Sequence, residues 1–200
     1  MNFYEAADSL SGPILQVHEW IQEAQDGKVA LPHAMNIASL DSAGRPTSRM
    51  VLLKRISEEG FVFFTYYEGN KGKQISAFPH VALTFWWAKT NKQIRIEGEC
   101  SKVSEKENDE YFSSRPRGSQ ISASVSLQSQ ELESYASLTQ KSESFEKEHS
   151  NKTIERPERG GGFIVAPISI EFWIDQKNRL HKRELYSKSG TDWKKALLSP

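Results

Sequence analysis

The sequence predicts a mainly β protein with several helices, in which antiparallel strands form a barrel or a sandwich. Three observations favour this fold class. Five extended segments rich in β-branched and aromatic residues follow one another between residues 34 and 103. The turn sequences Asp41-Ser-Ala-Gly44 and Ser57-Glu-Glu-Gly60 separate the first three segments. Strand patterns return after residue 163, so the end of the chain can close the sheet.

The first half of the chain begins with a helix and continues as strands. Residues 1–11 form a short N-terminal arm, and Pro13 suits a first helical turn. Apolar residues then follow at helical spacing until Gly27 ends the pattern, namely Ile14, Val17, Ile21 and Ala24. An antiparallel meander of three strands is expected next, over residues 34–40, 49–56 and 61–67. Two more strands are expected over residues 81–87 and 93–103.

The second half of the chain mixes helices with a long connection. Ser104-Glu-Lys-Glu107 is a capping-box sequence, so a helix is expected from there toward Phe112. A longer helix is expected over residues 131–149, with an apolar side made of Leu132, Tyr135, Leu138 and Phe145. Residues 143–162 mix charges densely and end in three glycines, which predicts an exposed connection. Strands over residues 163–174 and 179–186 then complete a single domain spanning 1–200.

Composition argues against several classes of function. The 26 basic and 26 acidic side chains leave no net charge, so a nucleic-acid partner is not expected. The apolar runs are too short to cross a membrane, and the first residues lack the pattern of a signal peptide, so no membrane partner and a cytoplasmic location are expected. Cys100 has no second cysteine to pair with and no metal-ligand spacing around it. A buried small hydrophobe is expected there, and no metal site.

The densest cluster of cations lies near the C-terminus, in Arg179-Leu-His-Lys-Arg183. If this stretch is extended, Arg179, His181 and Arg183 project from one face, and Lys182 lies on the other. Guanidinium groups bind phosphate through paired charge-assisted hydrogen bonds, and an imidazole beside them adds a further donor. The cluster indicates an anion site. The alternative is a solvated edge strand whose charges protect against aggregation.

Two further clusters contain cations; a solvated strand terminus is the alternative for the first, and the second suits a phosphate. The strand Arg49-Met-Val-Leu-Leu-Lys54 has cations at both ends, which face opposite ways unless the strand bends or bulges. Thr65 lies near Lys71 and Lys73, which belong to a loop flanked by glycines. A hydroxyl and amines beside free backbone amides suit a phosphate, although exposed loop lysines are usually inert.

Aromatic and amide side chains fit the rest of such a ligand. The segment Tyr111-Phe-Ser-Ser-Arg-Pro-Arg-Gly-Ser-Gln120 gathers an aromatic ring, two guanidinium groups and several hydroxyls at the end of a predicted helix. Gln128-Ser129 and Trp173 offer the amide, hydroxyl and indole groups that an uncharged heteroaromatic ring needs. The sequence shows no dinucleotide fingerprint and no convincing Ser/His/Asp arrangement. Side chains of this kind hold a cofactor that does the chemistry more often than they do it themselves.

Taken together, these segments resemble the pyridoxine (pyridoxamine) 5'-phosphate oxidase family, flavoproteins of the FMN-binding split-barrel fold. The likeness spans nearly the whole chain in the family's order, and its most specific elements are Ser114-Arg-Pro-Arg117 and Arg179-Leu-His-Lys-Arg183. The resemblance implies an antiparallel FMN-binding split β-barrel that forms a homodimer, with FMN at the interface and contacts from both subunits. That arrangement would also relax the spacing problem of Arg49 and Lys54.

The resemblance implies two sets of site residues. The FMN contacts would be Arg49, Met50, Val51, Leu52, Leu53, Lys54, Phe64, Thr65, Lys71, Gln93, Gln128, Ser129, Trp173 and Arg183. The phosphorylated pyridine substrate would contact Lys54, Tyr111, Arg115, Ser119, Arg179 and His181. Tyr111, Arg115 and Ser119 would hold the phosphate. Arg179 and His181 would be the catalytic pair that orients the ring and its reacting carbon.

The activity implied by the resemblance is an FMN-dependent oxidase. It would convert pyridoxamine or pyridoxine 5'-phosphate to pyridoxal 5'-phosphate by hydride transfer from substrate C4' to flavin N5, with O2 reduced to H2O2. No side chain would need to act as a strong base, because positioning over the flavin carries much of the catalysis. Two alternatives stay open: a related split-barrel flavin oxidase of secondary metabolism, of the phenazine type, and a non-catalytic protein that binds FMN or pyridoxal phosphate.

The sequence departs from the family pattern at several points. Asn70 stands where an arginine usually lies near the FMN phosphate, which removes a charge and weakens the expected cofactor binding. The N-terminal arm is shorter than usual, and in the family longer arms close over the substrate. Three other positions also differ from the usual residue types: Ser124, Gly160 and Lys182.

Overall fold

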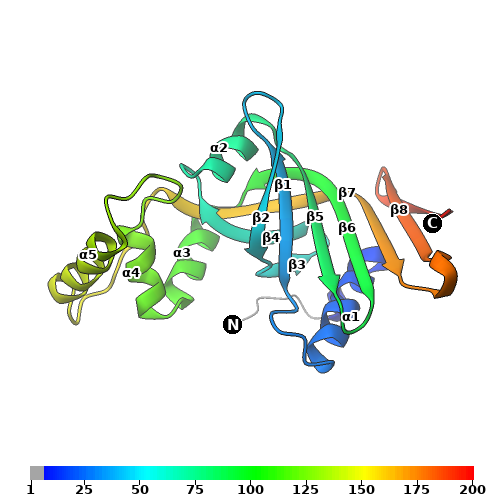
Figure 1. The fold of residues 1–200 in the computed structure, drawn as a ribbon, viewed down its shortest axis with the longest axis horizontal. Coiled ribbons are helices and arrows are strands. Elements are labelled where there is room, and N and C mark those ends of the chain that lie inside the picture. Colours follow the sequence, from blue (N-terminus) through cyan, green and yellow to red (C-terminus); the bar gives the residue numbers. More distant parts are fainter. Residues whose placement is uncertain (1–6) are drawn as a thin grey trace.

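The computed structural model describes residues 7–200. Figure 1 shows a curled antiparallel sheet with helices α3, α4 and α5 at one end of the molecule and strand β8 at the other. The chain begins with the short helix η1 (Ala7–Ser9) and α1 (Gly12–Asp26). Four strands follow, β1 (Ala34–Leu40), β2 (Pro46–Leu52), β3 (Arg55–Ser57) and β4 (Gly60–Tyr66).

The remaining elements alternate helices with longer strands. Helix α2 (Asn70–Ala77) leads into β5 (His80–Trp87) and β6 (Lys92–Lys102). Three helices come next, α3 (Glu105–Ser114), α4 (Arg117–Val125) and α5 (Tyr135–Glu148). The chain ends with β7 (Gly160–Ile174), η2 (Lys177–Arg179), β8 (Lys182–Ser189) and β9 (Asp192–Leu198). None of the helices found in residues 7–200 is both long and apolar enough to cross a membrane.

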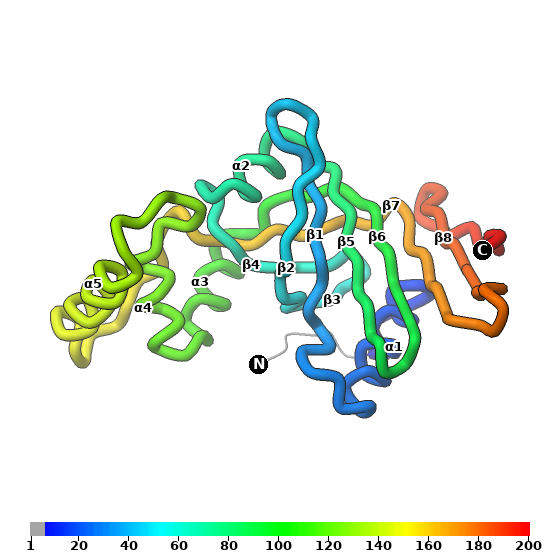
Figure 2. Tube along the Cα trace, in the orientation of Figure 1, coloured from blue at the N-terminus to red at the C-terminus, as the bar shows by residue number. Residues whose placement is uncertain are grey.

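Strand β7 organises the sheet. The hydrogen-bonded order is β2-β1-β5-β6-β7-β4-β3, and β8 joins β7 on one side and β9 on the other. The first half of β7 pairs with β4 and its second half with β8, while β6 runs beside it from Phe163 to Ile174. Figure 2 shows this long strand running from the helical end of the molecule to β8. On the edge opposite β6, strand β7 therefore pairs first with β4 and then with β8.

The main core lies between the sheet and α1. Helix α1 buries Ile14, Val17 and Ile21 in it, as the helical spacing predicted, and strand residues such as Phe63 and Phe85 complete it. Cys100 is buried as expected, and burial raises the pKa of its thiol to about 12. A smaller second core holds α3, α4 and α5 together and consists of Phe112, Ile121, Ala123 and Ile154, with Phe145 packed against it.

The predicted three-strand meander is wrong at its centre. Residues 49–56 do not form one strand, because the chain breaks between β2 and β3, and these two strands pair with β1 and β4 at opposite ends of the sheet order. The break leaves no orphan donor, since the Leu53 N–H donates to the His33 carbonyl at 2.9 Å and the Lys54 N–H to Val62 at 2.8 Å. Leu53 is thereby buried in the main core.

The helical segments differ in part from the prediction. The Ser104 cap is confirmed, since its hydroxyl accepts from the Glu107 N–H at 3.2 Å. The long helix begins four residues later than expected, at Tyr135, because Ser134 caps it by accepting from the Ser137 N–H at 3.0 Å. Leu132 and Tyr135, predicted on its apolar side, are exposed. Helices α2 and α4 and strand β9 were not predicted.

The predicted connection over residues 143–162 is too long at both ends. Its first residues are still in α5, and the three glycines are the first residues of β7, where they pair with Phe64, Thr65 and Tyr66 of β4. Glycine is required there by aromatic packing. A Cβ on Gly161 would lie 2.2 Å from the Tyr67 hydroxyl, and one on Gly162 would lie 2.8 Å from the Phe64 ring.

Replacement of Gly161 by alanine should therefore destabilise the fold by about 1–3 kcal/mol, the usual cost of overpacking a tight site. Gly118→Ala is the matched control, because a Cβ there meets no atom within 4 Å and lies in helix α4. That change should be neutral or slightly stabilising. Urea unfolding of both variants measures the difference, and equal midpoints would contradict the packing argument.

Candidate active site

A cavity of about 460 Å³ lies between the sheet and the helical end of the molecule. Strands β2 and β4, helices α2, α3 and α4, and the start of β7 all contribute to its walls. Eleven of the residues predicted for FMN or substrate line it: Met50, Val51, Leu52, Lys54, Phe64, Thr65, Lys71, Tyr111, Arg115, Ser119 and Gln128. The structure thus brings together residues that are up to 78 positions apart, from Met50 to Gln128.

One end of the cavity is a polar cluster at the start of α2. The Lys71 ammonium donates to the Thr65 hydroxyl at 2.8 Å and to the Gln128 amide oxygen at 2.6 Å. Ser129 lies beside them, and its hydroxyl accepts from the Asn70 N–H at 3.3 Å. Burial, and secondarily the nearby Arg49, lowers the pKa of Lys71 to about 8. A half-buried ammonium group without a carboxylate partner favours an anionic ligand.

Arg49 lies next to this cluster but does not line the cavity. Its guanidinium donates to the Gln74 amide oxygen at 2.7 Å, to Ser39 at 2.7 Å and to Thr47 at 2.8 Å. All three acceptors are neutral, and burial lowers the pKa of the guanidinium. Arg49 therefore adds uncompensated positive charge behind Lys71. Leu53 also misses the cavity, because its side chain is in the main core.

The other end of the cavity gathers cations and an aromatic ring. Tyr111 stacks on Phe64 with ring centroids 3.6 Å apart, and the Arg115 guanidinium lies 5.9 Å from the Tyr111 centroid. Ser119 is in the first turn of α4 and lines the cavity, and its N–H donates to the Pro116 carbonyl at 2.8 Å. Burial, and then repulsion from Arg115, lowers the pKa of Lys54. This end is suited to a second anion.

The bend between β2 and β3 explains how the chain meets the spacing problem of Arg49 and Lys54. Lys54 follows the end of β2 and lines the cavity together with Met50 and Leu52 of that strand. Arg49 remains on the other side, among the acceptors described above. The bent strand end that one ligand would require is present, but only Lys54 reaches the cavity.

A second group of predicted residues lies on β6, β7 and β8. Gln93 is opposite Trp173 in the β6–β7 register, and Trp173 is opposite Arg183 in the β7–β8 register. These side chains form a row on one face of the sheet. His181 is beside the row, with its ring 4.5 Å from that of Trp173 and its Nδ1 3.0 Å from the Asp175 carboxylate. Arg183 is paired with Glu171 at 2.7 Å.

The predicted single strand over residues 179–186 is wrong at its start. Strand β8 begins at Lys182, and Arg179 belongs to η2 in the tight turn before it. Asn178 and Arg179 have φ angles of +57° and +61°, so the chain cannot run straight through them. Arg179, His181 and Arg183 therefore do not lie along one strand, and strand alternation does not bring them to one face. The turn places His181 against Asp175 instead.

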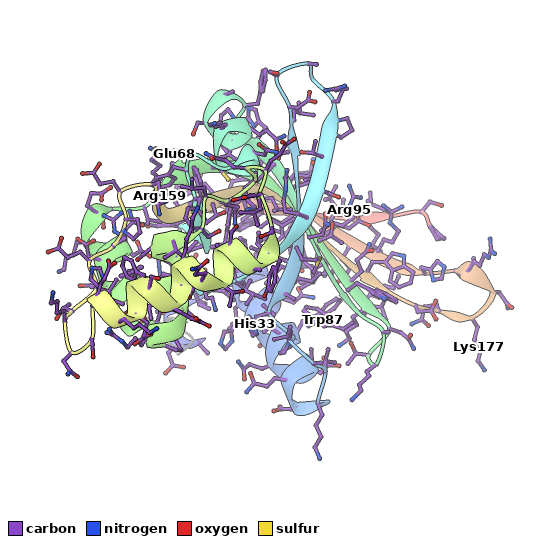
Figure 3. All side chains as sticks on the ribbon, turned by 60° about the vertical axis from the view of Figure 1, so that its left-hand side comes forward. His33, Glu68, Trp87, Arg95, Arg159 and Lys177 are labelled. Carbon is purple, nitrogen blue, oxygen red and sulfur yellow. The ribbon has the colours of Figure 1, made fainter. Side chains whose placement is uncertain are left out.

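The two groups of predicted residues lie far apart within one chain. Figure 3 shows Lys177 of η2 on the opposite side of the molecule from Arg159. Arg159 marks the helical end, because its guanidinium donates to the Ser124 carbonyl of α4. The row of Gln93, Trp173 and Arg183 adjoins η2 and β8, while the cavity adjoins α3 and α4. One chain by itself therefore does not assemble all the predicted residues into one site.

Sequence reasoning missed several residues of both groups. Asn108, Tyr66 and Arg156 line the cavity, although nothing in their local sequence marks them. Trp86 extends the row on β5, with its ring 5.9 Å from that of Trp173, and its side chain is 52% exposed. An aromatic pair in the strand Thr84-Phe-Trp-Trp87 could have drawn attention to it. Among the described residues that line the cavity there is no Asp or Glu.

Comparisons with known proteins fit this geometry. A family model described as "Pyridoxamine 5'-phosphate oxidase" matches residues 21–148, and one described as "Pyridoxine 5'-phosphate oxidase C-terminal dimerisation region" matches residues 161–200. A pyridoxine/pyridoxamine 5'-phosphate oxidase of Thermosynechococcus vestitus is 42% identical over 97% of this chain and 92% of its own length. One of Haemophilus influenzae is 44% identical over 96% and 91%.

Solved structures show the same fold. PhzG from Burkholderia lata, in complex with tetrahydrophenazine-1-carboxylic acid, superposes with a TM-score of 0.90 at 30% identity and covers 96% of this chain and 95% of its own. A pyridoxamine 5'-phosphate oxidase-related, FMN binding protein from Nostoc punctiforme superposes with a TM-score of 0.78 at 14% identity, covering 96% and 99%. The predicted antiparallel split barrel is confirmed. The chain belongs to the pyridoxamine 5'-phosphate oxidase family.

Proposed function

We propose that this protein is an FMN-dependent oxidase that converts pyridoxamine or pyridoxine 5'-phosphate to pyridoxal 5'-phosphate. The observation that carries the proposal is a cavity with cations at both ends, stacked aromatic rings in its wall and no carboxylate among its described lining residues. Two phosphate groups, one on the cofactor and one on the substrate, fit two separate positive ends. Relatives that carry this activity in their names match nearly the whole chain.

The residues present fit FMN on their own chemistry. Lys71, Thr65 and Gln128 form a half-buried cluster at the start of α2, where a phosphate group would meet an ammonium, a hydroxyl and helix N–H groups. Arg49 lies behind this cluster and adds positive charge. This charge would partly replace that of the arginine that the family usually has at the position of Asn70. These residues would hold the phosphate of FMN, and Met50 to Leu52 would lie along the flavin.

The substrate would occupy the other end of the cavity. Lys54, Arg115 and Ser119 would bind its phosphate, and the Tyr111 hydroxyl would add a donor from the wall. Burial raises the pKa of Tyr111, which keeps that hydroxyl protonated at neutral pH. Cations fixed around the phosphate would set the distance of the reacting carbon from the flavin. Positioning of this kind accounts for a large share of a rate enhancement.

Arg179 and His181 would complete the site from a second subunit. Residues 161–200 match a dimerisation region, and the row of Gln93, Trp173 and Arg183 on β6, β7 and β8 does not line the cavity of its own chain. In a homodimer, the partner subunit's row would close over each cavity, with FMN at the interface. The Asp175 carboxylate and the Gln176 N–H both lie against the His181 Nδ1, at 3.0 Å and 3.3 Å, so Nε2 would be the nitrogen that faces the substrate.

When bound, FMN supplies the two-electron acceptor that takes hydride from substrate C4' and passes the electrons to O2. The balance is pyridoxine 5'-phosphate plus O2 to pyridoxal 5'-phosphate plus H2O2, and the amine consumes one water and releases ammonia. The chain's own residues would bind and orient the substrate, and they would exclude water from the site. None of them has to remove a proton from carbon.

Oxygen consumption and H2O2 release by the FMN-loaded protein test the proposal. Turnover of pyridoxamine or pyridoxine 5'-phosphate is expected, with little turnover of the same vitamers lacking phosphate. A protein that binds FMN but oxidises neither phosphorylated vitamer would contradict the proposal. The close superposition with PhzG favours a second candidate, oxidation of a reduced tricyclic ring acid. A tetrahydrophenazine carboxylic acid in the same assay distinguishes the two.

The pKa of Lys71 predicts a pH dependence for cofactor binding. Below pH 8 the ammonium is charged and ready for the phosphate of FMN. Above that value the free protein must first take up a proton, so affinity should fall by up to about tenfold per pH unit. Quenching of flavin fluorescence between pH 7 and 9.5 measures this. Lys71→Arg stays charged throughout and should flatten the profile, whereas parallel profiles would exclude Lys71 as the titrating group.

A further inference from the structure

Asn108 is a polar side chain of helix α3 with no exposed surface. Both ends of its amide are used. The Oδ1 atom accepts from the Gly162 N–H at 2.7 Å, and Nδ2 donates to the Tyr67 hydroxyl at 3.2 Å. That hydroxyl in turn donates to the Gly162 carbonyl at 3.1 Å. The amide thus ties both backbone groups of one β7 residue to α3, directly and through Tyr67.

The amide lies on the same helix face as the substrate-side residues. Tyr111 and Arg115 follow Asn108 by three and seven positions, which is the spacing of one face, and all three line the cavity. Tyr111 stacks on Phe64, and Phe64 is the register partner of Gly162 in the β4–β7 pair. Asn108 therefore attaches α3 to β7 at the residue opposite Phe64, the β4 residue on which the Tyr111 ring rests.

The other links between α3 and the sheet are more exposed. Arg156 bridges Glu105 and Asp109 to the Gly160 carbonyl, but these carboxylates are 73% and 63% exposed, so solvent screens the pairs. The Arg55–Glu107 pair is also partly exposed. Phe112 packs into the second core, which joins the helices mainly to one another and meets the sheet at Tyr66 of β4. A fully buried amide with both ends satisfied is a stronger constraint than these.

We propose that Asn108 is a positioning residue for the substrate phosphate: it fixes the height and rotation of α3, so that Tyr111 and Arg115 keep their places at the end of the cavity. An amide is needed because it offers an acceptor to Gly162 and a donor to Tyr67 at once. Aspartate offers only acceptors and brings a negative charge toward the phosphate. Leucine offers neither. The role rests on the proposed function, since it concerns how that substrate is held.

The test compares phosphorylated and unphosphorylated substrates in the FMN-loaded full chain. Asn108→Leu should lower kcat/KM for pyridoxamine 5'-phosphate about tenfold or more, mainly through a higher KM. The Kd of FMN should stay within about twofold, because the α2 cluster is untouched. The preference for pyridoxamine 5'-phosphate over pyridoxamine should fall by the same factor as kcat/KM. A loss of stability alone would lower both rates together and leave the preference unchanged.

Two controls sharpen the result. Ile21→Val removes a buried methyl group from α1 in the main core, and it should leave the preference at the wild-type value. Asn108→Leu added to Arg115→Ala should cost little more than Arg115→Ala alone, because both act on one phosphate contact. Should Asn108→Leu not fold, Asn108→Asp keeps the acceptor for Gly162 and should show the same loss of preference.

The outcomes are distinguishable. An unchanged preference in a folded Asn108 variant would overturn the positioning role, and so would multiplicative losses in the double variant. A wild-type protein that oxidises neither phosphorylated vitamer would instead overturn the proposed function, and this role with it.

Discussion

Replacement of Arg179 by alanine should lower kcat/KM for pyridoxamine 5'-phosphate by about 10²-fold or more, while FMN stays bound. Among the described residues, the neighbouring His181 and Arg183 are paired with Asp175 and Glu171, but no ion pair holds Arg179. Its guanidinium is exposed in the free chain and therefore available to a ligand in the partner's cavity. Figure 1 shows helix α2, whose start would hold the FMN phosphate, far from strand β8, which directly follows the turn of Arg179.

The backbone at Arg179 supports this role. Asn178 and Arg179 are consecutive residues in left-handed conformation, which costs a residue with a Cβ on the order of 1 kcal/mol or more. Backbone strain at these two exposed residues indicates that the turn serves to direct the Arg179 guanidinium.

Lys177→Ala is the matched control for Arg179→Ala. Lys177 is an exposed cation of the same short helix, two residues earlier, and the proposed site does not use it. Stopped assays for H2O2 give turnover, and the ratio of flavin to protein absorbance gives FMN content. An undiminished rate in Arg179→Ala, or an equal loss in Lys177→Ala, would rule out the assigned role.

Alternation and capping predicted much of the fold because they are local. The strands over residues 34–40 and 81–87 and the cap at Ser104 depend on side-chain period and on a hydrogen bond between near neighbours. Helix α2 was missed because Gly72 lowers its helix propensity. The structure shows why a glycine is present: a Cβ there would lie 2.3 Å from the Tyr66 carbonyl, on a neighbouring segment that the local sequence does not reveal.

In the candidate site, too, the sequence predicted features with a local pattern and missed those that depend on distant segments. The polar clusters and the family resemblance together predicted Tyr111, Arg115 and Lys71 as site residues. The structure brings these three into one cavity. The break after Leu52 was not predicted, because it depends on two sheet edges that lie far apart in the sequence. Asn108 was missed for a similar reason: its partners are 41 and 54 residues away. A buried amide has no sequence pattern of its own.

Replacement of Arg115 by alanine should raise KM for the phosphorylated substrate by about 10–100-fold, the value of a charge-assisted hydrogen bond to phosphate. Arg117→Ala is the control. The Arg117 guanidinium is engaged with Glu146 and with the His149 and Lys152 carbonyls, away from the cavity. Steady-state kinetics with pyridoxamine 5'-phosphate measure both variants. Similar losses in the two would show that the helical end had been disturbed as a whole.

Mixing the two impaired variants, assayed at substrate concentrations well below their KM, tests whether the site is shared between subunits. In a heterodimer of Arg115→Ala and Arg179→Ala, one site carries both changes, and the other combines an intact cavity with an intact partner turn. Random exchange makes half of the dimers heterodimers, so roughly a quarter of the wild-type sites should reappear. Unfolding and refolding the variants together, and separately as the control, allows that exchange. If each subunit builds its site alone, the mixture stays as inactive as its components. Recovered activity would show that the separation of Arg115 from Arg179 within one chain is bridged by dimerisation.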